Sequence, residues 1–387
     1  MKRVGVLFGG PSVEHEVSII TAMQVMENMD KSRFVPVPIY VTKEGSWTMG
    51  EGYDCIDTFR EKRNQGEEVF LIPGRGGRLY ASRPQKSGLF GSAVDALTEV
   101  EKIDIFFPAL HGTMGEDGAI QGAFEVAGVP YVGCKVTAAA TGMDKIAMKG
   151  LFRSVGIPVM EGVGIDRLRW TYAKEDVLCE VKALGEELFV KPACLGSSIG
   201  IEKVKAEDVE GAIDDAFAYG ERVLVERAAT SPREINIAVL STADGVRVSA
   251  AEEPLEFEDL LKFEDKYLRG GKGAKGKEAS HRKLPAELSE DLKASMEELA
   301  MKAMQAIHGV GCARIDFLVE DGKPVVNEIN TMPGSLAFYL WEAVGLDFPT
   351  LLSRLIDDGL TRYEEEKKII KTYDVDLLSR TSYGTKR

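Results

Sequence analysis

The stretch CARIDFLVEDGKPVVNEIN, residues 312–330, decides the fold of the C-terminal part of the chain. Apolar and polar residues alternate on both sides of Asp321-Gly322-Lys323, a pattern typical of two antiparallel strands joined by a tight turn. We predict a three-residue hairpin loop here, with Gly322 in the left-handed conformation. In this register the more apolar face carries Ile315, Phe317, Val319, Val325, Asn327 and Ile329.

The same register brings four polar side chains together on the other face. Asp316 lies across from Glu328, and Arg314 lies across from Asn330. Facing carboxylates repel each other, so the pairing needs a compensating charge from Arg314 or from a metal ion. Two carboxylates and an amide oxygen form a hard donor set suited to Mg²⁺ shared with phosphates. A solvated polar face with one salt bridge is the alternative, and a two-residue loop would shift the register and break up the group.

Composition and charge narrow the functional classes. The 387 residues indicate two or three domains, and a hydrophobic content of 44% is enough to bury sizeable cores. With 48 basic and 62 acidic residues the net charge is −14, which disfavours nucleic acid and anionic membranes as partners. Five cysteines without a CxxC spacing argue against a disulfide framework or a zinc site and indicate a reducing compartment. Because no long apolar run occurs, we expect a cytoplasmic protein without membrane contact.

The N-terminal part alternates short apolar runs with helical patterns. A helix is predicted at residues 16–29, after the first strand. This order indicates a doubly wound, mostly parallel sheet with helices on both faces. Ligands bind at the carboxyl ends of such strands, here residues 9–14 and 111–117. The predicted strands are residues 4–8, 35–41, 104–110 and 129–132.

From about residue 141 the pattern changes to strand clusters with fewer helices, which favours two α+β units. We therefore predict a chain of class α/β and α+β with three domains, at residues 1–140, 141–229 and 230–372, and a polar tail at 373–387. The second and third domains are predicted to contain helices at 144–155 and 289–307 and strands at 188–192, 223–226, 234–240 and 246–251, besides the hairpin.

A glycine- and serine-rich loop follows the predicted strand at 188–192. The strand carries Lys191 near its end, and the loop reads GSSIG at residues 196–200. Backbone N–H groups in such a loop can approach phosphate oxygens closely, and a lysine adds a point charge. The loop matches neither GxxxxGK[ST] nor GxGxxG, so a phosphate site and an ordinary turn both stay open.

Residues 266–283 are basic and glycine-rich within an acidic chain. We interpret them as a lid that closes over a polyphosphate and excludes water. A nucleic-acid patch is disfavoured, because Tyr267 is the only aromatic residue there for base stacking. An ordinary surface loop is the third interpretation.

A series of motifs occurs in the order found in one enzyme family. On these motifs, residues 1 to about 360 resemble the D-alanine–D-alanine ligases of the ATP-grasp superfamily. The resemblance implies a doubly wound N-terminal domain followed by a two-part ATP-grasp fold. It also implies ligation of two D-alanines through an acyl phosphate for peptidoglycan synthesis. The motifs are GGPSVEHEVS (9–18), HGTMGEDG (111–118), QG (121–122), MDK (143–145), KP with GSSIG (191–200), KY (266–267), RID (314–316) and NEINTMPG (327–334).

The resemblance implies ATP and Mg²⁺ as the cofactors, with two metal ions expected and Mn²⁺ as an alternative. The metal ligands would be Asp316, Glu328 and Asn330. Among the residues implied for ATP, the lysines would contact phosphates, Glu226 and its neighbours the adenine, and Glu234 the ribose. These residues are Lys145, Lys191, Ser197, Ser198, Glu226, Arg227, Ala229, Glu234, Lys266, Asn327 and Glu328.

The resemblance also implies how the amino acids are bound. Glu14 would hold the ammonium of the first D-alanine near His111, and Ser197 and Tyr267 would link Glu14 to the lid. Lys266 would reach the transferring phosphoryl group, while Arg314 and the N–H of Gly334 would stabilise the oxyanion. The implied catalytic residues are Glu14, Ser197, Lys266, Tyr267, Arg314 and Gly334, and those implied for substrate are Glu14, His111, Tyr267, Arg314, Gly334, Ser335 and Leu336.

Two features concern the second substrate. Tyr267 matches family members that make dipeptides. Residues 335–341, SLAFYLW, depart from the family pattern, in which a Ser-hydrophobic pair grips the second carboxylate; Ser335 or Leu336 would take that part here. A D-Ala–D-Ser ligase, a ligase for another D-amino acid, and an ATP-binding scaffold that does not ligate therefore stay open. The family also suggests a homodimer.

Overall fold

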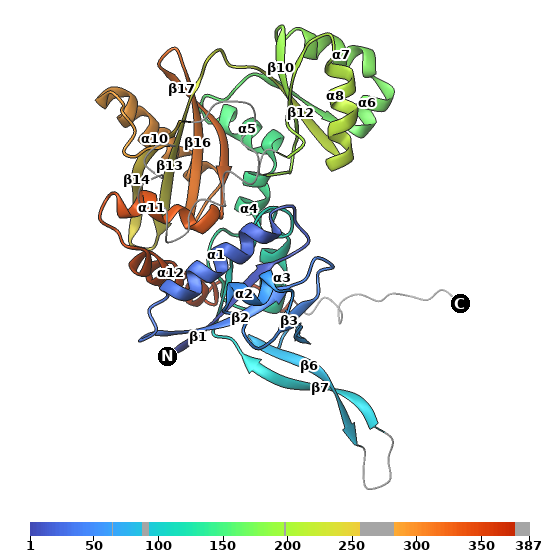
Figure 1. The fold of residues 1–387 in the computed structure, drawn as a ribbon, viewed down its shortest axis with the longest axis vertical. Helices are drawn as coiled ribbons and strands as arrows, with labels where there is room; N and C mark the ends of the chain where they lie inside the picture. Colours follow the sequence, from blue (N-terminus) through green and yellow to red (C-terminus); the bar gives the residue numbers. More distant parts are fainter. Residues whose placement is uncertain (64, 87–92, 197–198, 256–281, 376–387) are drawn as a thin grey trace.

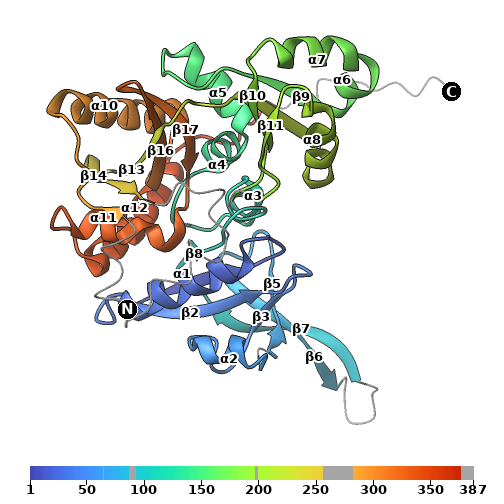
Figure 2. The ribbon, with the colours of Figure 1, turned by 45° about the horizontal axis from the view of Figure 1, so that its top comes forward.

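The computed structural model describes all residues except 64, 87–92, 197–198, 256–281 and 376–387. Within the described residues the strands form four sheets, three of which are the centres of the layers seen in Figures 1 and 2. This mixture of helices and sheets confirms the expected class. Ser197, Ser198, Lys266 and Tyr267 lie outside the described residues, as does most of the expected lid.

The N-terminal sheet has the strand order β4-β3-β2-β1-β8. Its central strand β1 (Lys2–Gly9) pairs in parallel with β2 (Phe34–Val41) and β8 (Ile105–Pro108), as expected. Residues 4–9 are buried, because a parallel strand in the middle of a sheet is covered on both faces. The covering helices are α1 (His15–Asn28) and α12 (Phe348–Glu366) on one face and α3 (Ala119–Ala127) on the other.

The expected strand at residues 129–132 is wrong. The chain leaves α3 through Gly128 in the left-handed conformation, and afterwards Tyr131 makes a single parallel bridge to Phe106. One residue reaches the sheet before the chain turns away, so no ladder forms there.

In the described part of the segment between β2 and β8, five strands and a short helix were not predicted from the sequence. A hairpin of β6 (Arg78–Lys86) and β7 (Ala93–Lys102) projects away from the N-terminal sheet (Figure 1). Most of the described residues of the hairpin beyond Ala81 are exposed, so the apolar alternation of a half-buried strand is weak there. The remaining elements are β3 (Trp47–Met49), α2 (Ile56–Arg60), β4 (Glu67–Glu68) and β5 (Phe70–Leu71).

A four-stranded antiparallel sheet forms the second layer, in the order β11-β10-β12-β9. Three helices pack their apolar side chains against it around Val177, Leu188 and Ile213. The strands are β9 (Gly162–Asp166), β10 (Glu187–Pro192), β11 (Glu202–Lys205) and β12 (Arg222–Arg227), and the helices are α6 (Arg167–Tyr172), α7 (Lys174–Lys182) and α8 (Val209–Ala216).

Helices α4 (Val136–Met143) and α5 (Lys145–Ser154) connect the N-terminal sheet to this layer. The Asp144 side chain accepts hydrogen bonds from the N–H groups of Ile146 and Ala147, which explains why a new helix begins directly after it. The helix expected at 144–155 is thus confirmed.

The third layer is an antiparallel sheet in the order β15-β14-β13-β16-β17. Helix α10 (Glu290–Ala306), capped by Ser289, covers its apolar face and confirms the helix expected at 289–307. The strands are β13 (Arg233–Thr242), β14 (Gly245–Pro254), β15 (Arg282–Lys283), β16 (Gly311–Glu320) and β17 (Lys323–Asn330).

The hairpin of β16 and β17 has the predicted polar pairs, but its loop differs from the predicted three-residue loop. Its loop has two residues, since Glu320 pairs with Lys323, and both Asp321 and Gly322 have positive φ. A β-bulge then inserts one extra residue, Asn327, opposite the step from Asp316 to Phe317. The bulge restores the register, so the predicted three-residue loop is wrong while the predicted polar pairs are confirmed.

The bulge also changes which residues of β17 are buried. Val326 pairs with Phe317 and is fully buried, while Val325 and Asn327 are half-buried. The predicted apolar face was therefore wrong at Val325 and Asn327, because alternation was assumed to be unbroken along the strand.

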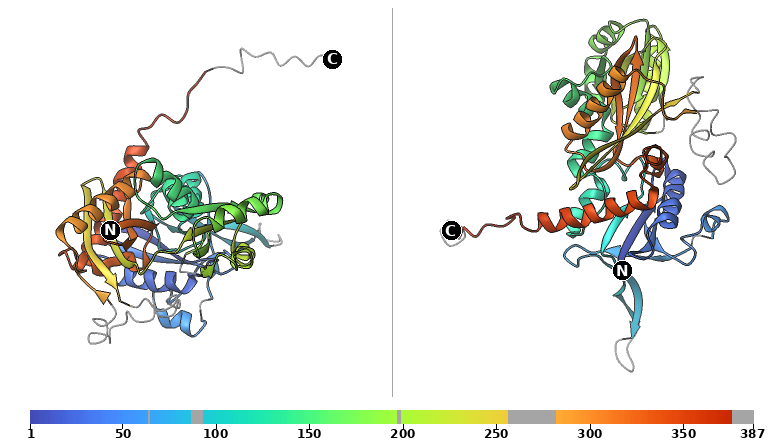
Figure 3. Two further views of the ribbon diagram at one scale, coloured as in Figure 1. Left: turned by 90° about the horizontal axis from the view of Figure 1, so that it is seen from above. Right: turned by 90° about the vertical axis from the view of Figure 1, so that its left-hand side faces the viewer.

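Helix α12 joins the first and third layers. It packs against β8 and α1 on one side and against β13 and β16 on the other, and the right-hand view of Figure 3 shows it between the two sheets. Near it, the short helix α11 (Phe338–Glu342) follows the turn at Gly334–Ala337. Among the described helices, none has both the length and the apolar character needed to cross a lipid bilayer.

Candidate active site

One row of polar side chains crosses four strands of the C-terminal sheet. Glu252 of β14 pairs with Asn236 of β13, Asn236 pairs with Asp316 of β16, and Asp316 pairs with Glu328 of β17. Because side chains alternate along each strand, this row lies on the face away from α10. Three carboxylates on one face require compensating cations nearby.

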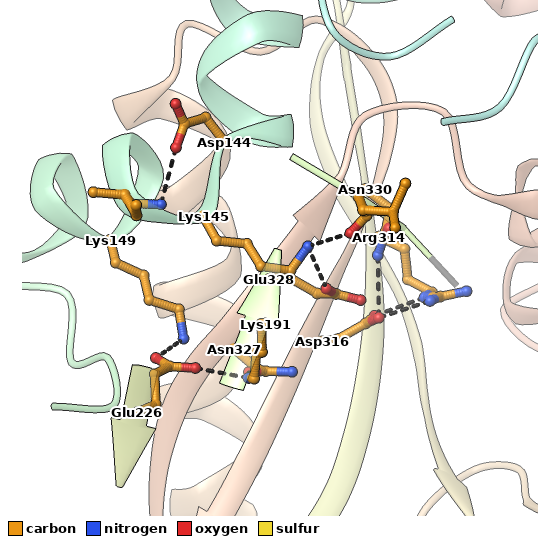
Figure 4. A network of polar contacts seen from close by, with 12 residues as sticks. Asp144, Lys145, Lys149, Lys191, Glu226, Arg314, Asp316, Asn327, Glu328 and Asn330 are labelled. Carbon is orange, nitrogen blue, oxygen red and sulfur yellow. Dashed lines mark hydrogen bonds and ion pairs between the residues drawn. The ribbon is translucent and has the colours of Figure 1, made fainter. Parts of the chain in front are cut away.

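Arg314 supplies one of these cations. Its guanidinium donates two hydrogen bonds to the Asp316 carboxylate, each 2.6 Å long, and the Asn330 amide donates a third of 3.1 Å (Figure 4). Burial alone would lower the pKa of Arg314, but the charge of Asp316 outweighs burial and raises this pKa well above its usual value. Arg314 is therefore a fixed positive charge beside the row.

Lys145 supplies the second cation. This buried side chain donates a hydrogen bond of 2.8 Å to the carbonyl of Leu195 and lies 3.6 Å from the Glu328 carboxylate. The expected metal ligands Asp316, Glu328 and Asn330 thus lie together, with each carboxylate next to its own cation. Two neighbouring carboxylates and an amide fit a hard divalent ion that is shared with phosphates.

A second cluster lies between α5, β10 and β12. Both oxygens of the Glu226 carboxylate are paired, one with Lys149 and the other with Lys191 at 2.7 Å (Figure 4). Lys191 also lies 3.4 Å from the amide oxygen of Asn327, the bulge residue. Burial would raise the pKa of Glu226, but the two lysines lower it to about 2. Lys149 was not selected from the sequence, although it lies four residues after Lys145 on the same helix face.

Glu14 joins the N-terminal layer to these clusters. A Cβ atom placed on Gly112 or on Gly196 would lie 2.6 or 2.7 Å from its Oε2 atom, so two backbone segments press against this buried carboxylate. It also lines one pocket with Lys145 and Glu328. Among the described residues, the pocket is lined by Glu14, Glu116, Gly142, Met143, Lys145, Gly196, Glu328, Ile329, Asn330 and Thr331.

Glu116 is a pocket residue that the sequence analysis missed. Its carboxylate accepts the N–H of Gly112 at 2.9 Å and the N–H of Met332 at 3.0 Å. Burial, and then the nearby charge of Glu14, raise its pKa to about 8. Its position inside the HGTMGEDG motif was the available signal.

His111 and Thr21 hold the segment that follows β17. The Thr21 hydroxyl accepts the N–H of Ser335 at 3.1 Å and is hydrogen-bonded to His111 Nε2, 2.7 Å away. Burial lowers the pKa of His111 to about 4, against a hydrogen bond to the Met332 backbone that raises it. His111 is thus a neutral, buried link, and Thr21 is a residue with no sequence signal beyond its place on α1.

The segment that departs from the family pattern forms a left-handed turn. Ser335, Leu336 and Ala337 have φ values of 52°, 54° and 49°, which cost conformational energy in residues other than glycine. The Leu336 side chain is 1% exposed and packs in the core between the first and third layers, while Ser335 is half-buried. Gly334 begins this turn. The binding of substrate by Ser335, Leu336 and Gly334 stays a prediction.

The remaining expected ATP residues lie at the end of β12, in the segment that follows it, and at the start of β13. Arg227 donates two hydrogen bonds of 3.1 and 2.7 Å to Glu320, and Ala229 lies half-buried just after β12. Glu234 is half-buried on β13. These contacts join β12 to β16, and the expected contacts of the three residues with ATP stay predictions.

The fold has counterparts among solved ligases. It matches the D-alanine–D-alanine ligase from Coxiella burnetii with a TM-score of 0.75 and 28% identity, covering 95% of this chain and 98% of that one. It also matches the VanG D-Ala:D-Ser ligase from Enterococcus faecalis, with a TM-score of 0.74, 29% identity, and coverage of 92% and 99%. The fold and the site define a ligase of the ATP-grasp class.

Sequence comparison narrows this class to one family. Residues 3–134 match the family model described as D-ala D-ala ligase N-terminus, and residues 151–357 match D-ala D-ala ligase C-terminus. A D-alanine–D-alanine ligase of Heliobacterium modesticaldum is 38% identical over 376 residues, 95% of this chain and 97% of the relative. One of Thermosipho melanesiensis is 36% identical over 384 residues, 98% of each. The chain belongs to the D-alanine–D-alanine ligase family.

Proposed function

We propose that this enzyme joins two D-alanines to D-alanyl-D-alanine with cleavage of ATP to ADP and phosphate, for the synthesis of peptidoglycan precursors. The family match over both halves of the chain supports the reaction. The observation that carries the proposal to this site is the pocket in which Glu14 of the N-terminal layer meets Lys145 and Glu328. A ligase of this kind needs a carboxylate that binds the amino group of the substrate close to lysines that bind the phosphates of ATP.

The reaction needs activation, because a carboxylate is a poor electrophile. The γ-phosphoryl group of ATP is transferred to a carboxylate oxygen of the first D-alanine, giving an acyl phosphate and ADP. The amine of the second D-alanine then attacks the carbonyl carbon. The new C–N bond forms, the C–O bond to phosphate breaks, and the amine loses a proton. Charge builds up on phosphate and carbonyl oxygens, where fixed cations contribute most.

The residues of this chain are assigned by their position and charge. Glu14 binds the ammonium of the first D-alanine, and His111 supports the adjoining segment as a neutral hydrogen-bonding group. Lys145 and Lys191 bind phosphate oxygens, and Arg227 and Ala229 line the nucleotide with Glu234. Glu226, whose carboxylate oxygens are paired with Lys149 and Lys191, acts on the nucleotide through Lys191. Arg314 and the N–H of Gly334 stabilise the oxyanion, since the charge of Asp316 raises the pKa of Arg314 well above its usual value.

Asp316, Glu328 and Asn330 hold Mg²⁺, or Mn²⁺ in its place, in this proposal. An ion held by these residues would supply charge neutralisation at the phosphate oxygens. Lys145 and Arg314 each place a cation beside one carboxylate of the set, Glu328 and Asp316 respectively.

A second candidate is ligation of D-alanine to D-serine. It is supported by the left-handed turn at residues 335–337, which departs from the family pattern where the second substrate binds. It is also supported by the likeness to a ligase described as D-Ala:D-Ser. We further propose a cytoplasmic homodimer with domains at residues 1–140, 141–229 and 230–372.

Phosphate release from ATP and Mg²⁺ tests the function. The enzyme is supplied with single D- and L-amino acids, with D-alanine plus D-serine, and with D-lactate, and products are identified by mass. D-alanyl-D-alanine from D-alanine alone is expected. A product that requires D-serine would support the second candidate, and ATP binding without any turnover would contradict both.

A further inference from the structure

Lys149 is a buried cation that the reaction above does not use. It lies on α5 and is 1% exposed, and its ammonium is paired with Glu226. Burial lowers its pKa to about 8, even though the charge of Glu226 acts in the opposite direction. An ammonium at this position therefore carries a desolvation cost, which calls for an explanation of its presence.

The cluster contains one more positive charge than it needs for its own neutrality. The Glu226 carboxylate is 1% exposed, and a single lysine would compensate it. Instead Lys149 pairs with one oxygen and Lys191 with the other, so the buried group of three carries a net charge of +1. Such a group is suited to a site that receives an anion.

The two lysines differ in what they can reach. The Lys191 side chain is 10% exposed and also approaches Asn327 on β17, whereas the Lys149 side chain is 2% exposed (Figure 4). Only Lys191 therefore has a route toward a ligand between the layers. If Lys191 turned to a phosphate without Lys149, the Glu226 carboxylate would be left buried and unpaired, a strongly unfavourable state.

We propose that Lys149 is a positioning residue for nucleotide binding, which keeps Glu226 neutralised so that the Lys191 ammonium can move to the phosphates. This inference rests on the proposed function, because it takes Lys191 as a phosphate ligand. Lys149 itself does not touch the nucleotide. Lys149 affects the affinity for nucleotide through the Glu226 carboxylate, which it shares with Lys191. A double-mutant cycle of Lys149 and Glu226 measures this coupling.

The test measures the affinity for a non-hydrolysable ATP analogue with Mg²⁺ by calorimetry. We compare the wild type, Lys149→Met, Glu226→Gln and the double variant. Lys149→Met should weaken binding at least tenfold, because Lys191 is then needed by Glu226. In the Glu226→Gln background the same change should have little effect, because the neutral amide that replaces the carboxylate needs no cation. In turnover, Lys149→Met should raise the KM for ATP more than it lowers kcat.

Two controls accompany the cycle. Lys149→Arg keeps the charge and should retain affinity within a few-fold. Lys174→Met removes an equal charge from an exposed pair with Glu210 in the same layer and should leave affinity unchanged. If Lys149→Met does not fold, the comparison of Glu226→Gln with the double variant still tests the inference, because a further large loss of affinity in a background without the carboxylate would contradict it.

The outcomes separate this inference from the proposed function. Failure of the wild type to bind the analogue would contradict the proposed function. A wild type that binds, together with a folded Lys149→Met of equal affinity or with additive effects in the cycle, would show that Lys149 only holds α5 to β12.

Discussion

The Oε1 atom of Glu116 accepts a hydrogen bond from the backbone N–H of Met332 at 3.0 Å. The two residues lie in different layers, and the Glu116 Oε2 atom accepts the N–H of Gly112 in the same loop as Glu116. Glu116 thus ties the loop after β8 to the segment that leads into Gly334. The position of the proposed oxyanion group therefore depends on a carboxylate from the N-terminal layer.

Glu116 should make stability depend on pH in a defined window. Its pKa is about 8 in the folded protein against 4.5 as its ordinary value, so the folded state holds the proton more tightly. The stability gained is present in full below pH 4.5 and is lost as the pH rises through 8. Relative to Glu116→Gln, the free energy of unfolding of the wild type should fall across this window by more than about 1.4 kcal/mol, the equivalent of one pKa unit. Urea unfolding at several pH values measures it, and parallel curves for the two proteins would contradict it.

Thr21→Val should weaken the link between α1 and the turn at residues 335–337. The change leaves the Ser335 N–H and His111 Nε2 without their shared partner, which costs about 1–3 kcal/mol for buried groups. We expect a loss of that size in unfolding free energy and a fall in kcat. Thr21→Ser keeps the hydroxyl and should retain most of both. Equal kcat for valine and serine variants would exclude a role in positioning.

Arg314→Ala should abolish turnover while nucleotide binding persists. Removing a fixed cation at a developing oxyanion costs about 10²–10³ in kcat. The matched control is Arg233→Ala, which breaks a similar two-bond pair with Glu253 on the same sheet, but at a more exposed position. Single-turnover kinetics measures the chemical step separately from nucleotide binding. Near-normal turnover in a folded Arg314→Ala protein would remove this residue from the mechanism.

Gly196→Ala should impair binding of the first D-alanine. The new methyl would lie 2.7 Å from Glu14 Oε2, and this buried carboxylate would have to move. Displacing a packed group costs about 1–3 kcal/mol, so the KM for D-alanine should rise about tenfold or more, and more than the KM for ATP. Gly211→Ala on α8 is the control, because a Cβ there meets no atom within 4 Å. An unchanged KM for D-alanine would show that Glu14 is not held in this way.

The residue pattern of the hairpin was enough to predict its polar pairs, but not how they arise. The alternation in CARIDFLVEDGKPVVNEIN predicts two strands, and the pairs of Arg314 with Asn330 and Asp316 with Glu328 are observed. A two-residue loop and the bulge at Asn327 produce this register together. The bulge brings Asn327 near Lys191, which lies on a strand of another sheet, so local alternation contains no information about it.

The sequence by itself determined the parallel strands β1, β2 and β8, the helices α1, α5 and α10, the hairpin of β16 and β17, and the set of ligase motifs. These are local properties, since hydrophobic period and caps such as Asp144 act within a few residues. Only the tertiary structure decided which polar groups from distant parts of the chain meet. Lys149, Glu116 and Thr21 acquire their roles from Glu226, Met332 and Ser335, which are 77, 216 and 314 residues away along the chain. Burial then decides how much these contacts contribute to stability, because a polar or charged group that folding removes from water is costly without a partner.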